Sequence, residues 1–281
     1  MPEGSDLVVS GPWTTQMAQC FHNGLADGLT LNYARGFQER NLSFLKGLPI
    51  RRLTILARTM SDLDPVYELA TTLTELSVET DERTPIDLGR LPHLRILAAS
   101  WRQVRQTIGS AEKLEKCLLL SYEEVDLTPL GALTSLSSLA LKDHPAVASL
   151  AGLDRLPWLT DLGIYSARDL EDLSELRRTA SPTLQRLQLE SCRRIETLEA
   201  IACCEALTFL NAGDCGDIAS LQPIARLGRL ESLYLYESTR IVDNDLTPIT
   251  KLPRLRDFRM RSRRSYVPSV PDLQQAIIAR N

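Results

Sequence analysis

One apolar motif, L-x-x-L-x-L, returns along almost the whole chain, and this repetition constrains the fold more than any other feature of the sequence. Its clearest copy consists of Leu184, Leu187 and Leu189. Copies, some with other apolar residues in place of leucine, start at residues 26, 50, 73, 94, 114, 136, 159, 184, 207, 230 and 255, so that successive starts lie 20 to 25 residues apart. A period of this length is typical of one small structural unit that stacks on its neighbours. The chain is therefore predicted to fold as an array of coils.

The spacing inside each repeat predicts its local structure. Alternation in the second half of the motif indicates a short strand whose apolar residues point into the coil and whose intervening residues point outward. The segments between strands carry apolar residues at every third position, as at Leu127, Leu130 and Leu133. That spacing favours 3₁₀ turns or very short helices, because side chains at positions i and i+3 eclipse there.

The motif and its period resemble those of leucine-rich repeat proteins, whose unit reads L-x-x-L-x-L-x-x-N/C-x-L. The resemblance covers residues 26 to 260 and is to the short repeats of internalins and phosphatase-regulatory leucine-rich proteins, with cysteine-type spacing in the later coils. It implies an α/β solenoid, a leucine-rich repeat horseshoe of about 11 coils. The concave face would carry a parallel β-sheet, and the convex face would carry 3₁₀ or short-helix returns.

The Asn/Cys position of the motif holds Cys192, Cys215 and Ser238 in three successive coils. Earlier coils depart from the pattern and hold Arg58, Asp81, Arg102, Tyr122, His144 and Ala167. A disulfide, a metal site and a repeat would all make cysteine recur, but no C-x-x-C or paired histidine accompanies these residues. We expect Cys192 and Cys215 to stack as buried thiols.

The adjacent pair Cys203 and Cys204 lies on a return segment. Only one of the two side chains can face inward. The other is a candidate for an exposed, reactive thiol.

Both ends of the repeat array need a cover, because an open terminal coil would expose its core. Residues 1–25 are predicted to form an N-terminal cap, with a strand followed by a short helix that Thr14 or Thr15 caps, that runs through Phe21 and that Asn23-Gly24 stops. The repeats then span residues 26–262, and residues 263–281 form a C-terminal cap helix in which Leu273 and Ile277 share one face. The whole is predicted to be one structural domain.

Composition narrows the class of protein. A net charge of -4 over 281 residues gives no general attraction to nucleic acid or an anionic membrane, and the chain lacks a long apolar run. Six irregularly spaced cysteines are too few for a disulfide framework in a chain of this length, which fits the cytoplasmic location that we expect. We also expect a monomer. The chain contains no recognisable nucleophile, zinc or P-loop motif, which favours a non-catalytic protein without cofactor or metal.

Two outward-facing patches are predicted on the concave face. The apolar one contains Ile96, Ala98, Leu118 and Leu120 with Trp101 at its rim, although "KCLLLSY" fits either strand phase. The aromatic one contains Tyr165, Arg186, Phe209, Tyr234 and Tyr236. Exposed apolar, tyrosine and arginine clusters are typical of binding hot spots between proteins.

A second candidate site is the arginine-rich last coil. It contains Arg256, Arg259, Arg261, Arg263 and Arg264. Arginine pairs strongly with carboxylates and phosphates, so this coil could bind an acidic partner, a phosphorylated ligand or RNA; a solvated final coil is the alternative interpretation.

The sequence therefore favours a non-catalytic scaffold that binds a protein or peptide on its concave face. The resemblance to leucine-rich inhibitors implies an inhibitor, immunity protein or regulatory subunit, and the sequence is equally compatible with an adaptor. The alternative hypothesis is recognition of RNA or a phospho-ligand by the arginine-rich coil, although nucleic acid is not the expected partner.

Overall fold

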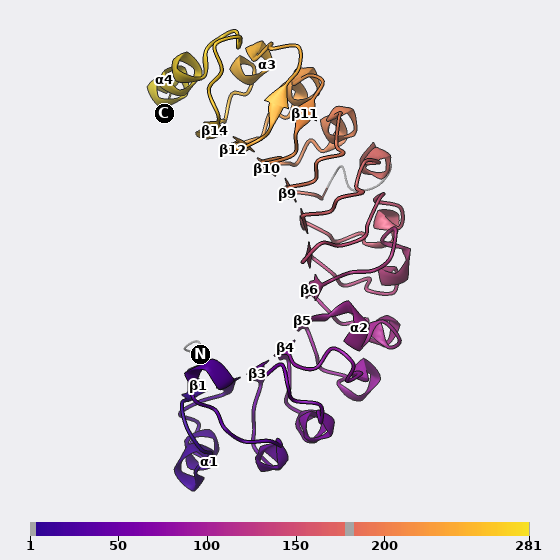
Figure 1. Cartoon of the computed structure of the whole chain (residues 1–281), viewed down its shortest axis with the longest axis vertical. Helices are drawn as coiled ribbons and strands as arrows, with labels where there is room; N and C mark the ends of the chain where they lie inside the picture. Colours follow the sequence, from indigo (N-terminus) through magenta and orange to yellow (C-terminus); the bar gives the residue numbers. More distant parts are fainter. Residues whose placement is uncertain (1–3, 178–182, 281) are drawn as a thin grey trace. The chain divides into compact units, whose positions relative to one another are not determined.

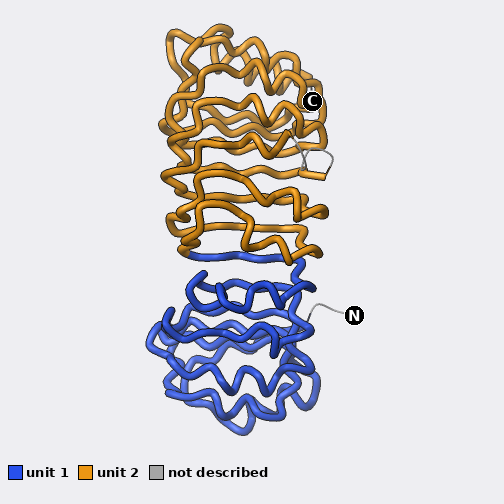
Figure 2. Tube along the Cα trace, turned by 90° about the vertical axis from the view of Figure 1, so that its right-hand side faces the viewer, with its two compact units in different colours: residues 1–120 blue, residues 121–281 orange. Residues whose placement is uncertain are grey.

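The computed structural model of the chain describes residues 4–177 and 183–280. The chain divides into two compact units, residues 1–120 and 121–281 (Figure 2). In each unit, parallel strands line one side and short helical segments line the other (Figure 1). The predicted arrangement of strands and returns is confirmed.

The first unit contains the parallel strands β1 to β6 in sequence order. Its strands are β1 (Asp6–Val9), β2 (Gly28–Asn32), β3 (Arg52–Leu56), β4 (Glu75–Glu79), β5 (Ile96–Ser100) and β6 (Lys116–Leu120). Its helices are α1 (Thr15–His22), α2 (Trp101–Val104) and the 3₁₀ segments η1 (Tyr33–Arg35), η2 (Ser43–Leu45), η3 (Asp64–Leu69), η4 (Leu88–Arg90) and η5 (Ile108–Ser110).

The second unit continues the pattern with six parallel strands in its main sheet, counted over the described residues. These are β7 (Ser138–Lys142), β8 (Asp161–Tyr165), β9 (Arg186–Glu190), β10 (Phe209–Asn211), β12 (Ser232–Leu235) and β14 (Asp257–Met260), and β11 (Asp217–Ile218) pairs separately with β13 (Arg240–Ile241). Its helices are η6 (Thr128–Leu130), η7 (Leu153–Arg155), η8 (Ser174–Arg177), η9 (Glu199–Cys203), η10 (Gln222–Arg226), α3 (Thr247–Thr250) and α4 (Val270–Arg280).

Strand register follows the leucine motif. Leu162 of β8 lies opposite Leu187 of β9, which in turn lies opposite Leu210 of β10. Each of the eleven motif copies found in the sequence contains a strand within the described residues. In β6, Cys117 and Leu119 are buried while the neighbouring Leu118 and Leu120 are half-buried, so the ambiguous "KCLLLSY" segment has the phase of the repeat frame.

The turns after six strands of the main sheet, β6 to β10 and β12, use an unusual backbone conformation. The seventh residue after the motif start has a positive φ of 51° to 61° in six successive coils. These residues are Ser121, Asp143, Ser166, Ser191, Asp214 and Glu237. Small polar side chains tolerate this left-handed region better than β-branched ones do, and most of the six are serine or aspartate. The next residue can then turn inward.

This turn corrects the prediction for Ser238. The structure places Ser238 on the surface, and Thr239 fills the inward position that Cys192 and Cys215 occupy in the two preceding coils. The coil of β12 holds one extra residue after its left-handed Glu237, as does the coil of β7, where Pro145 is the buried one. Of the earlier exceptions, Tyr122 and Ala167 are also buried, and Arg58, Arg102 and His144 are exposed.

The cysteines behave as core residues. Cys192 and Cys215 are fully buried, their thiols face backbone carbonyls of Ile164 and Leu189, and burial raises the pKa of each to about 12. Cys204 faces inward and Cys203 is half-buried, so one of the pair lies inside, as predicted. The reactivity of Cys203 stays a prediction.

Both predicted cap elements are present. Helix α1 begins after Thr14, whose side chain accepts a hydrogen bond from the Met17 amide, and it ends at His22 with Asn23 as its C-cap. At the other end, α4 buries Leu273 and Ile277. Its Gln274 donates a hydrogen bond to the Phe258 carbonyl of β14, which ties the helix to the last coil.

Thr239 provides a test of this packing. Its hydroxyl donates to the Ala212 carbonyl at 2.7 Å and accepts from the Cys215 amide at 3.0 Å, entirely within the core. Thr239→Val keeps the volume and removes both bonds, so we expect a loss of about 1–3 kcal/mol in the free energy of unfolding, measured by urea titration.

The matched control is Thr134→Val in an exposed turn, where a change within about 0.5 kcal/mol is expected. Equal effects of the two substitutions would show that Thr239 does not couple its coil to the preceding one.

Candidate functional site

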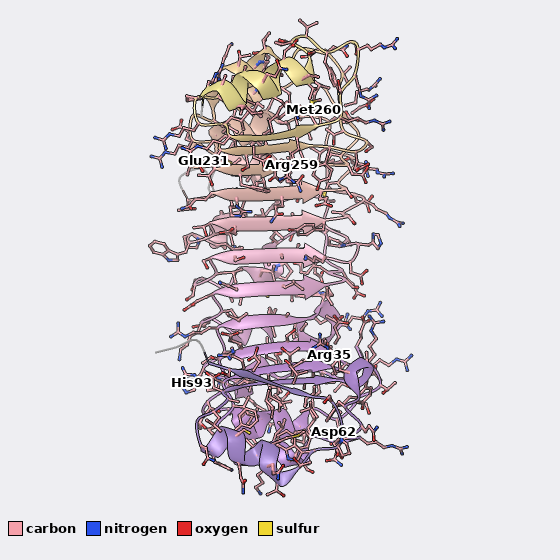
Figure 3. All side chains as sticks on the ribbon, turned by 90° about the vertical axis from the view of Figure 1, so that its left-hand side faces the viewer. Arg35, Asp62, His93, Glu231, Arg259 and Met260 are labelled. Atoms are coloured by element: carbon pink, nitrogen blue, oxygen red, sulfur yellow. The ribbon has the colours of Figure 1, made fainter. Side chains whose placement is uncertain are left out.

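The outward face of the strands, here called the sheet face, carries the side chains predicted to bind a partner (Figure 3). In the first unit, Ile96, Leu118 and Leu120 lie on this face and are half-buried. Ile96 lies beside Lys116, and Ala98 lies beside Leu118 in register. The apolar patch is therefore small and bordered by a charged side chain.

Trp101 does not belong to this patch, and its predicted place at the rim is wrong. Helix α2 begins at Trp101 directly after β5, which turns the chain inward, and the side chain is only 2% exposed. The same turn buries Gln103, whose amide donates to the Thr80 hydroxyl at 2.9 Å. Both residues are parts of the core.

In the second unit, four side chains from four coils form what we call the cation–aromatic ladder: Arg186, Phe209, Tyr234 and Arg259. The Arg186 guanidinium lies 4.1 Å from the centre of the Phe209 ring, and the Arg259 guanidinium lies 4.5 Å from that of Tyr234. The two rings meet edge to face with their centres 5.1 Å apart. Cation–π and edge-to-face contacts of this geometry are attractive and hold the side chains in defined positions.

Two aspartates neutralise the ladder at its ends. Asp161 lies 3.2 Å from the Arg186 guanidinium. Asp257 accepts hydrogen bonds from Nε and Nη2 of Arg259 and from the Tyr234 hydroxyl at 2.6 Å. The bonds from Arg259 and then from Tyr234 lower the pKa of Asp257, and Asp257 in turn raises the pKa of Tyr234. The ladder therefore presents aromatic surface with its charges already paired.

A second group, the strand-end cluster, consists of Tyr165, Glu190, Asn211 and Tyr236. The Asn211 amide nitrogen donates to Glu190 at 3.2 Å and lies 3.1 Å from the Tyr236 hydroxyl. Burial, followed by the nearby Glu190 carboxylate, raises the pKa of Tyr165; burial is also the main reason why the pKa of Tyr236 is raised. Both phenols stay neutral at physiological pH.

Two outward-facing glycines seat the tyrosine rings of this cluster. A β-carbon on Gly163 would lie 2.8 Å from the ring of Tyr165, and one on Gly213 would lie 2.6 Å from the ring of Tyr236. Such distances are shorter than carbon atoms tolerate, so any larger residue would lift the ring. The glycines let the rings lie close to the sheet, and they make a flat, preorganised surface.

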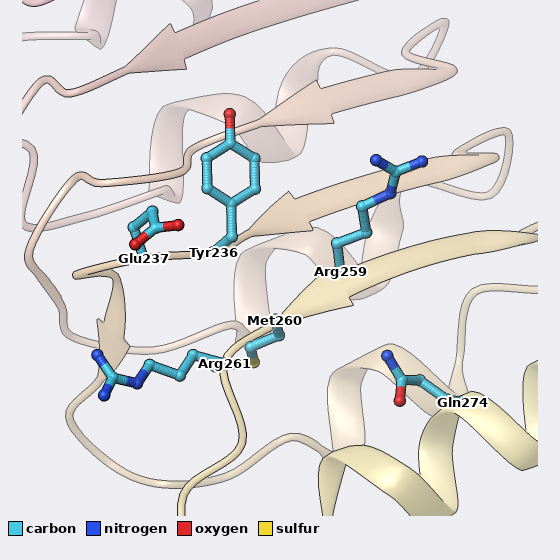
Figure 4. A pocket seen from close by; sticks show the side chains of 6 residues that line it. All are labelled: Tyr236, Glu237, Arg259, Met260, Arg261 and Gln274. Atoms are coloured by element: carbon cyan, nitrogen blue, oxygen red, sulfur yellow. The ribbon is translucent and has the colours of Figure 1, made fainter.

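The sheet face ends in a shallow depression of about 460 Å³ in front of α4 (Figure 4). It is lined by Tyr236, Glu237, Arg259, Met260, Arg261 and Gln274. Tyr236 belongs to the strand-end cluster and Arg259 to the ladder, so this depression extends the same surface to the end of the second unit.

The arginine-rich coil is not gathered around one point. Arg259 is paired with Asp257. Arg263 is half-buried and interacts with Asp217 of β11, whose pKa is lowered first by the hydrogen bond from Arg240 and less by the charge of Arg263. Arg261 extends away from Arg259 in Figure 4. Arg256 and Arg264 are exposed.

The described residues show neither a metal site nor a membrane-spanning helix. In residues 4–177 and 183–280, no group of three or more His, Cys, Asp or Glu side chains could hold a metal ion. No helix in the described part of the chain is long and apolar enough to cross a membrane.

Comparison with known proteins identifies the fold. Neither a protein-family profile nor a curated protein sequence matches the chain. Among solved structures, an internalin from Listeria monocytogenes is similar over 86% of this chain and 77% of its own, with 19% identity and a TM-score of 0.54. A leucine-rich repeat protein from Leptospira interrogans covers 90% of this chain and 72% of its own, with 18% identity and a TM-score of 0.58.

A third similar structure is the plant peptide hormone receptor RGFR1 in complex with RGF2, which covers 92% of this chain and 43% of its own, with 15% identity and a TM-score of 0.56. With its parallel strands, 3₁₀ returns and 20- to 25-residue period, the chain has the leucine-rich repeat fold. The resemblance seen in the sequence is confirmed.

Sequence reasoning placed the aromatic side chains on the sheet face but missed the polar residues that fix them. Asp161, Glu190, Asn211 and Asp257 all occupy outward positions of the repeat frame. One signal was available: Asp161 and Arg186 lie opposite each other in adjacent coils, which favours an ion pair. The two outward-facing glycines, Gly163 and Gly213, were a second signal, because a position without a side chain leaves room for a neighbouring ring.

Substitution of Gly213 tests whether the glycine seats the tyrosine. In Gly213→Ala the new methyl group displaces the Tyr236 ring from Asn211, and loss of burial should move the pKa of Tyr236 back toward that of a free tyrosine. NMR titration of tyrosine Cζ signals measures this change. The control Gly228→Ala adds a methyl group in open space and should leave the titration unchanged; identical curves for both variants would contradict the seating.

Acid should weaken the ladder selectively. The pKa of Asp257 is lower in the folded chain than in the unfolded chain, where it is about 3.9. The ionised carboxylate therefore stabilises the fold above the unfolded pKa, and this stabilisation is lost as the pH falls through the folded pKa. Asp257→Asn should therefore unfold more easily than wild type at neutral pH, with the difference shrinking toward pH about 2. A difference in urea midpoint that is independent of pH would refute this role.

Proposed function

We propose that the protein is a non-catalytic scaffold that binds a protein or peptide on the sheet face of its second unit. The contact surface would comprise the cation–aromatic ladder and the strand-end cluster, and would continue into the depression in front of α4. Tyr165, Arg186, Phe209, Tyr234 and Tyr236 are its proposed contact residues. Ile96, Leu118 and Leu120 of the first unit form a lesser candidate patch.

The observation that carries this proposal is the preorganised aromatic surface. Its rings are held by cation–π contacts, hydrogen bonds and glycine seats, so a partner would pay little side-chain entropy on binding. Tyrosine and arginine that are fixed in this way are typical of hot spots at protein interfaces. A standard interface would bury about 800 Å² on each partner.

Charge pairing argues for a protein rather than RNA. Arg186 and Arg259 already hold Asp161 and Asp257, so neither guanidinium offers an uncompensated charge to a phosphate backbone. Binding of nucleic acid depends on unpaired cations and weakens steeply with salt. Affinity capture at two salt concentrations also tests the alternative, in which Arg256, Arg261, Arg263 and Arg264 recognise RNA or a phospho-ligand.

The physiological role that fits such a surface is that of an inhibitor, immunity protein or regulatory subunit that covers its target. We propose that the protein acts in the cytoplasm as a monomer. All six cysteines are free, which is usual in a reducing compartment.

The test is affinity capture from native lysate at about 0.15 M and about 0.5 M salt. Wild type is compared with the Tyr234→Ala/Tyr236→Ala double variant, whose substitutions remove two half-buried rings of the sheet face and leave the leucine core intact. We expect wild type to retain one protein at both salt concentrations and the double variant to lose it, because an aromatic interface is little screened by ions.

Trp158→Ala is the matched control. This indole is 67% exposed and precedes β8, at the opposite end of the strand from Tyr165. Its removal should leave capture unchanged. If the double variant still binds the partner, or if only nucleic acid is recovered at low salt, the proposed use of the sheet face is wrong.

A further inference from the structure

A second depression, of about 570 Å³, lies just beyond the sheet face of the second unit. It follows the carboxyl ends of β7 to β10, where each strand enters its turn. We call it the edge depression; it is lined by His144, Ser166, Arg168, Ser191, Arg193 and Asp214. Ser166 directly follows Tyr165, and Ser191 directly follows Glu190, so the edge depression borders the strand-end cluster.

The repeat places these side chains together. Ser166, Ser191 and Asp214 are the left-handed turn residues of three successive coils. Arg168 and Arg193 each follow the buried residue of their turn, Ala167 and Cys192. Because the coils stack in register, equivalent turn residues line up along one edge, as ligand groups must if they are to converge.

The single carboxylate lining the edge depression is already neutralised. Asp214 accepts two hydrogen bonds from the Arg193 guanidinium, at 3.0 and 3.1 Å, and one from the Ser191 hydroxyl at 3.0 Å. A hydrogen bond from Ser238 together with those from Arg193 and Ser191 lowers the pKa of Asp214, so it is a stable anion with its acceptors occupied.

Arg168 supplies the edge depression with hydrogen-bond donors that are not already used. Its side chain is exposed, and among the described residues it has no hydrogen-bond or ion-pair partner. The nearest acids in sequence are engaged elsewhere, because Asp169 and Glu171 pair with Arg194 at 3.3 and 2.6 Å. In the preceding coil, Asp143 accepts a hydrogen bond from the Ser121 hydroxyl at 2.7 Å. Among the residues that the structure describes, the Ser166 hydroxyl and the His144 side chain also have no hydrogen-bond or ion-pair partner, and both belong to the same lining.

We propose that the edge depression binds an oxyanion carried by the partner protein, either a carboxylate side chain or a phosphate monoester, with Arg168 as the principal ligand. The planar fork of arginine matches both groups, and serine hydroxyls can complete their hydrogen bonds. This inference rests on the proposed function, since it names the charged group that the partner places beside the aromatic surface.

The test measures the site without the partner. N-acetyl-O-phosphoserine amide and N-acetyl-aspartate amide are titrated into the full-length protein at low ionic strength, and amide shifts are followed by NMR. We expect saturable shifts centred on Ser166, Arg168 and Ser191. In Arg168→Gln the apparent dissociation constant should rise about tenfold or more, which corresponds to about 1.4 kcal/mol.

The matched control is Arg229→Gln, which removes an exposed arginine just before β12, outside the lining of the edge depression. It should leave both titrations unchanged. Tighter binding of the phosphoserine probe would identify a phosphorylated partner residue, and comparable binding of both probes would identify a carboxylate. The proposal is overturned if neither probe gives saturable shifts at these residues, or if Arg168→Gln binds as wild type does.

The Tyr234→Ala/Tyr236→Ala variant separates this proposal from the previous one. It should still bind the probes as wild type does, because its substitutions lie outside the edge depression. Loss of the protein partner with retained probe binding supports the oxyanion site, and loss of probe binding in this variant refutes the assignment to Arg168 and its neighbours.

Discussion

Stacking of one coil on the next is the interaction on which the rest of the structure depends. A coil of about 23 residues encloses too little apolar surface to fold alone, and its leucines become buried only when the neighbouring coil covers them. Strand register, the inward turn after each strand and the placement of the outward residues all follow from that requirement. Leu187, for example, lies between Leu162 and Leu210. The neighbouring outward residues are then brought into columns, whatever their chemistry.

The sheet face uses those columns to hold side chains that would otherwise be mobile. Long residues such as arginine and tyrosine normally lose rotamer entropy on binding. Here the ladder and the strand-end cluster restrict them in the free protein, through contacts between residues 21 to 25 positions apart in the sequence. The same columns explain why polar residues at the strand ends, Ser191 and Asp214 among them, form a continuous edge. Aromatic surface and donor-rich edge are products of one repeat geometry.

Periodicity was enough to predict the strands, the returns and the buried cysteines, because each follows from a local pattern repeated many times. The two cap helices were predicted from a capping threonine and from the spacing of Leu273 and Ile277. It failed where a single coil departs from the average. An extra residue after Glu237 moves Thr239 into the core in place of Ser238, and a helix that starts at Trp101 turns its indole inward. Neither event changes the L-x-x-L-x-L spacing within a copy of the motif, from which the structure was predicted. The pairings of the site depend on side-chain conformations between coils, so the frame located Tyr236 and Asn211 without indicating that they meet.

The glycine beneath Tyr236 has a consequence for how such a protein can change. Repeat arrays are usually regarded as modular, with coils that can be exchanged, duplicated or deleted one at a time. Gly213 belongs to the coil of β10 and the ring above it belongs to the coil of β12. A coil that replaces that of β10 must therefore keep the glycine, and one that replaces that of β12 must keep a ring that fits over it. The two coils can be exchanged only together. In recombination or in engineering, the smallest unit that preserves this surface is the pair of coils.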